Sequence, residues 1–153
     1  MTQRNVLVKI SGNLIENEEV IAWLQQLTVD FHAVICTGGG TQINEAFKER
    51  GFAIKFGPYG RETSSFEERQ LARDVLEINQ AQIQDLLREK NINAEVVIPV
   101  KNIGSVLCHI NGDLYVLDGL LGFDRICVLT EQMNVEKKKS FYAQYPKVEV
   151  IGF

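Results

Sequence analysis

The stretch VICTGGGTQINEAF (residues 34–47) joins an apolar run to three consecutive glycines and to the start of a helical pattern. The apolar run predicts a buried strand that stops at the glycines. The apolar residues Ile43, Ala46 and Phe47 then recur at helical spacing, with Thr41 as the expected cap and Gly51 as the expected stop. Because three glycines in a row cost a folded chain backbone entropy, we expect something to approach this backbone closely.

Similar patterns continue on both sides of this stretch. Apolar runs predict strands at residues 5–10, 31–36, 95–99, 125–130 and 148–151. Amphipathic spacing predicts helices at residues 16–27, 41–51 and 65–90. Continuous apolar strands that alternate with such helices are typical of an α/β fold. We therefore expect one domain over residues 1–153, a three-layer αβα sandwich with a mainly parallel central sheet.

Three segments have less regular patterns. Residues 52–59 carry glycine and proline turn signals, which predict a loop with some extended structure. Residues 105–109 and 114–117 flank Asn111-Gly112-Asp113, which predicts a β-hairpin with a tight turn. Residues 135–146 (VEKKKSFYAQYP) have the composition of an exposed loop, with Lys137, Lys138 and Lys139 in water.

Composition excludes several classes of protein. The chain has 153 residues, 45% of them hydrophobic, and a net charge of -4, which does not favour nucleic-acid binding. It has neither an apolar stretch near the roughly 18 residues of a membrane span nor a secretory start, so we expect no membrane partner and a cytoplasmic protein. Its three cysteines form no CxxC motif, which favours buried reduced thiols and no metal site.

Two glycine turns follow predicted neighbouring strands, at Ser11-Gly12 and at Gly38-Gly39-Gly40. In an open parallel sheet ligands bind beyond the carboxyl ends of the strands, and a glycine turn that enters a helix presents free N–H groups to an anion. Lys9 lies just before the first turn and is suited to bind a phosphate there. The alternative is purely structural: the glycines permit tight turns, and Lys9 reaches solvent. Neither GxxxxGK[ST] nor GxGxxG is present.

The chain resembles the amino acid kinase family in four places. VLVKISGNLI (residues 6–15) is similar to the first strand and lysine–glycine turn of that family, in the form found in bacterial UMP kinases. Residues 34–52 resemble the second signature of N-acetylglutamate kinases more closely. Residues 60–94 are similar to the arginine segment and long helix on the acceptor side, and FDRICVLTEQMNV (residues 123–135) to the later strand that begins the nucleotide-binding lobe.

The resemblance implies transfer of the γ-phosphoryl of ATP, bound with Mg²⁺, to a carboxylate or phosphate of a small anionic metabolite. Lys9 would neutralise the transferring phosphoryl, and Asp113 would order the family's lysines. The phosphate would be bound by Ser11, Gly12, Gly38, Gly39 and Gly40, mainly through backbone N–H groups. Arg61 would bind an anionic group of the acceptor, helped by Asn44, and Thr130 and Glu131 would lie near the nucleotide. As a plain turn aspartate, Asp113 needs no function, and Asn44 is equally explained as a surface amide of a helix.

The chain also departs from the family. The glycine-rich segment with the second phosphate lysine is missing, so we expect the nucleotide lobe at the C-terminal end to be truncated. A phosphotransferase is therefore one hypothesis, and a non-catalytic anion- or metabolite-binding or regulatory protein is the other. A third possibility is that a second copy completes the lobe, as a homo-oligomer.

Overall fold

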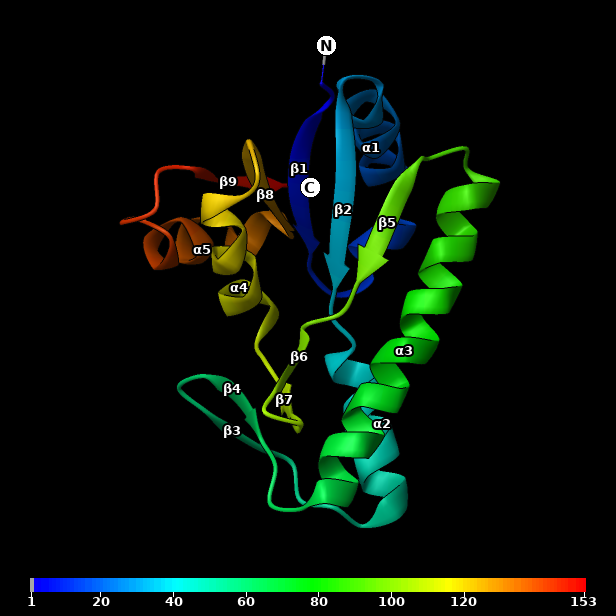
Figure 1. Ribbon diagram of the computed structural model, residues 1–153, viewed down its shortest axis with the longest axis vertical. Helices are drawn as coiled ribbons and strands as arrows, with labels where there is room; N and C mark the ends of the chain where they lie inside the picture. Colours follow the sequence, from blue (N-terminus) through cyan, green and yellow to red (C-terminus); the bar gives the residue numbers. More distant parts are fainter. Residues whose placement is uncertain (1) are drawn as a thin grey trace.

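The computed structural model describes residues 2–153 and is built on a five-stranded sheet (Figure 1). Its strands are β1 (Arg4–Ile10), β2 (Phe31–Thr37), β5 (Ala94–Val97), β8 (Arg125–Thr130) and β9 (Val148–Gly152). They lie in the order β5-β2-β1-β8-β9, and every neighbouring pair is parallel. The predicted α/β class with a parallel central sheet is confirmed.

Five α-helices and three short 3₁₀ segments connect the strands. They are α1 (Glu18–Asp30), α2 (Gly40–Arg50), α3 (Phe66–Glu89), α4 (Gly112–Tyr115) and α5 (Val135–Phe141), with η1 (Gly12–Glu16), η2 (Val116–Leu121) and η3 (Gln132–Asn134). The ends of the helices follow ordinary capping chemistry: the Ser65 hydroxyl accepts from the backbone N–H of Glu68, and Gly51 ends α2 at a φ of 72°.

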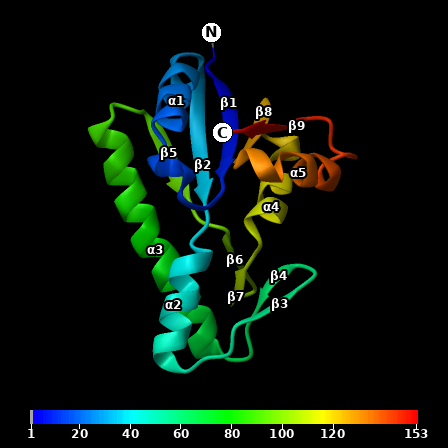
Figure 2. The same cartoon turned by 180° about the vertical axis from the view of Figure 1, so that it is seen from behind.

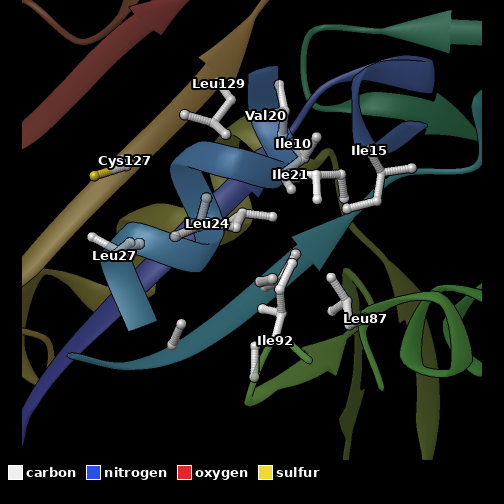
Figure 3. Packing of buried hydrophobic residues seen from close by; sticks show 14 of the residues in the cluster. Ile10, Ile15, Val20, Ile21, Leu24, Leu27, Leu87, Ile92, Cys127 and Leu129 are labelled. Atoms are coloured by element: carbon white, nitrogen blue, oxygen red, sulfur yellow. The ribbon is translucent and has the colours of Figure 1, made fainter. Parts of the chain in front are cut away.

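The two faces of the sheet bury different side chains. Val6, Val8 and Ile10 of β1 face α1 and the last part of α3, in the larger apolar cluster (Figure 3). Leu7 points to the other face, into a cluster with residues of η2 and with Tyr142, which follows α5. This alternation along a single strand places helices on both faces of the sheet, and it accounts for the predicted three layers.

The outer edge of β5 is covered by two glutamines of α3. The Gln84 side chain donates to the carbonyl of Ala94 (2.9 Å) and accepts from the N–H of Val96 (3.0 Å). The Gln80 amide donates to the carbonyl of Val96 (2.7 Å). These contacts satisfy backbone groups that an edge strand would otherwise offer to another chain.

A second group of elements lies beyond the carboxyl ends of β2 and β5 (Figures 1 and 2). It contains α2, much of α3 and two antiparallel hairpins, β3–β4 (Lys55–Gly57 and Gly60–Glu62) and β6–β7 (Val100–Ile103 and Val106–His109). Ile43, Phe47, Ala72 and Leu76 pack between α2 and α3 as a separate apolar cluster.

Two predicted segments fold differently. Asn111-Gly112-Asp113 is not a hairpin turn, because the Asn111 side chain accepts from the N–H of Asp113 and caps α4. The actual hairpin turns at Gly104 and Ser105, whose φ values of 55° and 67° are left-handed, as a two-residue type I′ turn requires. Residues 135–146 are not a loop throughout, because Val135 and Tyr142 are buried and hold α5 against the sheet.

Two smaller predictions were also wrong. Thr41 does not cap α2: the helix begins at Gly40, so that Gly39 occupies the cap position and Thr41 lies in the first turn. Phe66 and Ile78, predicted on the inner face of the long helix, are 59% exposed. Phe66 is the first residue of α3.

The close approach expected at the three glycines is made by α3. A Cβ atom at Gly39 would lie 2.6 Å from Nδ2 of Asn79 and 3.0 Å from Cδ2 of Leu76. Added Cβ atoms at Gly38 and Gly40 would meet no described atom within 4 Å. Only the middle glycine is therefore required by packing, and the two flanking glycines border open space.

The free cysteines are Cys36 and Cys127, buried in the sheet, and Cys108, partly exposed on β7, so the predicted burial holds for two of the three. None of the helices within residues 2–153 combines the length and the apolar character that a membrane span needs.

We predict that Gly39→Ala lowers the free energy of unfolding by about 1–3 kcal/mol, because the added methyl group must displace Asn79 and the buried Leu76. Gly38→Ala, at an open position of the same turn, is the matched control and should change stability much less. Urea denaturation of the three proteins measures both effects. Equal stability of the two variants would contradict the packing role of Gly39.

Candidate functional site

An open cavity of about 650 Å³ lies at the carboxyl edge of the sheet. The N-terminus of α2, the middle of α3, the β3–β4 hairpin and residues 109–113 surround it. The predicted site residues that line it are Lys9, Gly12, Gly38, Gly39, Gly40, Arg61 and Asp113. Sequence positions more than 100 residues apart therefore share one cavity, as the resemblance implied for most of them.

A cluster of charges forms one part of the wall. Nζ of Lys9 lies 3.2 Å from Oδ1 of Asp113 and donates a 2.9 Å hydrogen bond to the Ser11 hydroxyl. The other oxygen of Asp113 accepts from Lys138 of α5, and Tyr142 donates from its hydroxyl to the backbone carbonyl of Asp113 (2.7 Å). One carboxylate thus holds two ammonium groups at the cavity wall.

Burial and charge act against each other in this cluster. Lys9 is 8% exposed, and burial lowers the pKa of its ammonium although Asp113 opposes that shift. Burial alone would raise the pKa of Asp113, but Lys9 and Lys138 outweigh it, so that the pKa is lowered and the carboxylate stays ionised. The three groups therefore carry one net positive charge toward the cavity.

Lys138 was not recognised from the sequence, which placed it in a solvated loop. Lys138 faces the cavity, whereas Lys137 and Lys139 are exposed. The helical spacing of Val135, Lys138 and Tyr142 puts these three residues on one face of the α5 segment. That spacing is the signal that could have identified Lys138.

The two glycine turns differ in whether their backbone N–H groups are already hydrogen-bonded within the fold. The backbone N–H of Ser11 donates to the carbonyl of Leu129 (3.1 Å), because the pairing of β1 with β8 continues one residue past the strand. This N–H group is therefore already hydrogen-bonded within the fold, and phosphate binding by Ser11 stays a prediction. In the first turn of α2, the N–H groups of Gly40, Thr41 and Gln42 have no acceptor within the helix and border the cavity.

Arg61 enters the cavity from β4, opposite Phe56 in the hairpin register. The Cζ atom of its guanidinium lies over two rings, 4.8 Å from the centre of Phe56 and 5.2 Å from that of Phe47. Nη2 donates to the Gly40 carbonyl (3.2 Å) and to the side chain of Asn44 (2.8 Å). Asn44, predicted to bind substrate, does not line the cavity and instead positions Arg61.

The remaining donors of Arg61 are unused. The residue is 9% exposed, and burial lowers the pKa of its guanidinium. Within residues 2–153, neither Nε nor Nη1 has a hydrogen-bond acceptor. A buried cation with two unpaired donors is costly, and an anion in the cavity would supply the missing acceptors.

His109 lines the same cavity at the end of β7 and was not predicted as a site residue. Its Nδ1 atom is buried and finds no partner in the part of the chain that the structure describes. Burial and the nearby charge of Arg61 lower the pKa of His109 to about 4. The sequence carries no local signal for this residue, because the charge that acts on it, Arg61, lies on β4, far away in the chain.

The predicted nucleotide contacts lie outside the cavity. Thr130 ends β8 with 1% exposure, and its carbonyl accepts from the N–H of Phe153 (3.0 Å). Glu131 is exposed, and neither residue lines the cavity. No group of three or more His, Cys, Asp or Glu side chains within residues 2–153 is placed to hold a metal ion.

No protein-family model and no curated protein matches this chain. Solved structures share its fold. The chain is similar to smu.665 from Streptococcus mutans UA159, with 14% identity, a TM-score of 0.70, and coverage of 93% of this chain and 84% of that one.

Two structures of N-acetylglutamate synthase from Neisseria gonorrhoeae are also similar. In the one complexed with coenzyme A and N-acetyl-glutamate, the identity is 10% and the TM-score 0.56, over 99% of this chain and 55% of that chain. In the one complexed with coenzyme A and L-arginine, the identity is 11% and the TM-score 0.51, over 84% and 44%. The chain thus spans about half of the synthase, and the likeness shows the fold alone.

Proposed function

We propose that this chain binds a small metabolite with anionic groups, carboxylate or phosphate, in the cavity at the carboxyl edge of the sheet. The observation that carries the proposal is Arg61, a buried cation that lines the cavity with two donors unpaired in the described chain. Such donors lose the hydration they had in water, and an anion that accepts from both recovers the lost interaction energy.

The rest of the cavity wall fits a ligand with a second anionic or polar group. Lys9 and Lys138 leave one positive charge beyond what Asp113 neutralises, and the first turn of α2 adds N–H groups. Between these groups α3 offers the amides of Asn79 and Gln82 beside the apolar Ile83. N-acetyl-glutamate and L-arginine, the ligands in the two synthase structures, are both carboxylates. They belong to the ligand class that we propose.

We predict that Arg61→Lys weakens the binding of N-acetyl-glutamate, phosphate or sulfate by about tenfold or more, because a lysine cannot donate two parallel bonds to one anion. Titration calorimetry or the ligand-induced rise in melting temperature measures the loss. Arg73→Ala, on the outer part of α3 and paired with Asp74, is the control and should bind like the parent chain. The proposal fails if none of these anions binds, or if Arg61→Lys binds all of them unchanged.

A second candidate function is phosphoryl transfer from MgATP to an acceptor in this cavity. The arrangement of Lys9, Asp113 and Lys138 favours it, because two ammonium groups near one point can neutralise the charge of a transferring phosphoryl. An acceptor oxygen would form a bond to the γ-phosphorus while the bond from phosphorus to the β–γ bridging oxygen breaks, and ADP would leave with that electron pair. The magnesium ion would arrive bound to the nucleotide phosphates.

We predict for this candidate that ADP is released only when an acceptor such as N-acetyl-glutamate is present. Lys9→Met should reduce that rate about a hundredfold or more, since it removes one stabilising charge from the transition state. Lys48→Met, an exposed lysine of α2, is the matched control. The absence of both acceptor-dependent ADP release and any thermal shift with MgATP would reject phosphoryl transfer and leave the binding function intact.

A further inference from the structure

The strand that carries Arg61 packs tightly against the segment that carries His109. A Cβ atom at Gly60, the residue before Arg61, would lie 2.9 Å from Cβ of Asn111, two residues after His109. Both Arg61 and His109 line the cavity, and both have buried nitrogen atoms without a partner in the described chain. Three buried nitrogen atoms of these two cavity-lining residues therefore lack a partner within the described chain: Nε and Nη1 of Arg61 and Nδ1 of His109.

Charged residues lie on three of the elements around His109. β4 carries Arg61, β6 carries Lys101, and α3, which packs against β7, carries charged residues that include Glu68 and Arg69. Glu68 accepts from the backbone N–H of Ser64, and Lys101 pairs with Asp118. Of these charges, only Arg61 shifts the pKa of His109, and it acts in the same direction as burial.

We propose that Arg61 and His109 form a single proton-coupled anion site, in which His109 takes up a proton as an anion binds to the free edge of the guanidinium. The inference rests on the proposed binding function and adds a specificity residue to it. The bound anion accepts from Arg61 and from the protonated Nδ1 of His109. The proton comes from solvent, and no covalent bond is made or broken in the anion.

Binding of an anion and protonation of His109 favour each other. Without a ligand, the pKa of His109 is about 4, so the ring is neutral near pH 7. A bound anion offsets the charge of Arg61 and accepts from the ring, which raises the pKa of His109 toward its ordinary value of about 6.5. At a pH between about 4 and about 6.5, the complex therefore holds one more proton than the free protein. The affinity for the anion consequently increases as the pH falls. With these values, an anion binds about tenfold more tightly at pH 5.5 than at pH 7.5.

Sulfate is the probe, because it remains a dianion over this range and cannot itself supply the proton. Its dissociation constant is measured at both pH values for the parent chain, for His109→Asn and for His32→Asn. The chain has two histidines, and His32 pairs with Asn5 at the start of the sheet, remote from its carboxyl edge. His32→Asn is therefore the matched control.

We predict about tenfold tighter sulfate binding at pH 5.5 for the parent chain and for His32→Asn, and a pH-independent constant for His109→Asn. His109→Gln replaces His109→Asn if the shorter side chain prevents folding. NMR titration of the His109 ring provides a second readout, and its pKa should rise from about 4 to about 6.5 when sulfate is added. Measurable sulfate binding with the same constant at both pH values, or a pH dependence that survives in the His109 variants, would overturn the inference and spare the binding function. If sulfate binds at neither pH, the inference is overturned, and the binding function is then decided by N-acetyl-glutamate and phosphate.

Discussion

The buried ion pair between Lys9 and Asp113 is the interaction on which the cavity depends. Lys9 stands in an otherwise apolar central strand, where an ammonium without a partner would cost several kcal/mol. Asp113 supplies that partner from α4, and Lys138 reaches the same carboxylate from α5. One side chain therefore fixes β1, α4 and α5 with respect to one another, and it leaves an excess of positive charge facing the cavity.

Arg61 links the elements on the opposite side of the cavity, the β3–β4 hairpin and α2. Its contacts to Gly40 and Asn44 tie the β3–β4 hairpin to the start of α2, and its guanidinium also lies over the rings of Phe47 and Phe56. These hydrogen bonds use only Nη2 among the guanidinium nitrogens. They fix the position of the cation and leave Nε and Nη1 without a partner in the described chain. A cation that is held rigidly and left unpaired loses little further conformational entropy when it binds a ligand.

Local patterns in the sequence were sufficient for the elements of the sheet and the long helix. The strand predicted at residues 125–130 coincides with β8, and the helix predicted at residues 65–90 differs from α3 by one residue at each end. The predictions of secondary structure failed at residues 111–113 and at α5. Asn111 acts as a helix cap and not as a turn residue, and α5 is too short for its periodicity to stand out.

The sequence motifs predicted part of the candidate site. Lys9, Asp113, Arg61 and the glycines do meet at one cavity. Lys138 was missed because α5 is too short for the spacing of Val135, Lys138 and Tyr142 to stand out, and His109 because the charge that acts on it, Arg61, lies 48 residues away in the chain. The close approach expected at the three glycines is made at Gly39 by Asn79 and Leu76, whereas Gly38 and Gly40 border open space.

The most direct test of the account is a crystal structure of the chain grown with selenate, whose selenium atom is located by anomalous diffraction. The account predicts an anomalous peak in the cavity, with a selenate oxygen about 2.7–3.2 Å from Nε or Nη1 of Arg61. Selenate bound only on the outer surface, with both of those nitrogen atoms still unpaired, would contradict it.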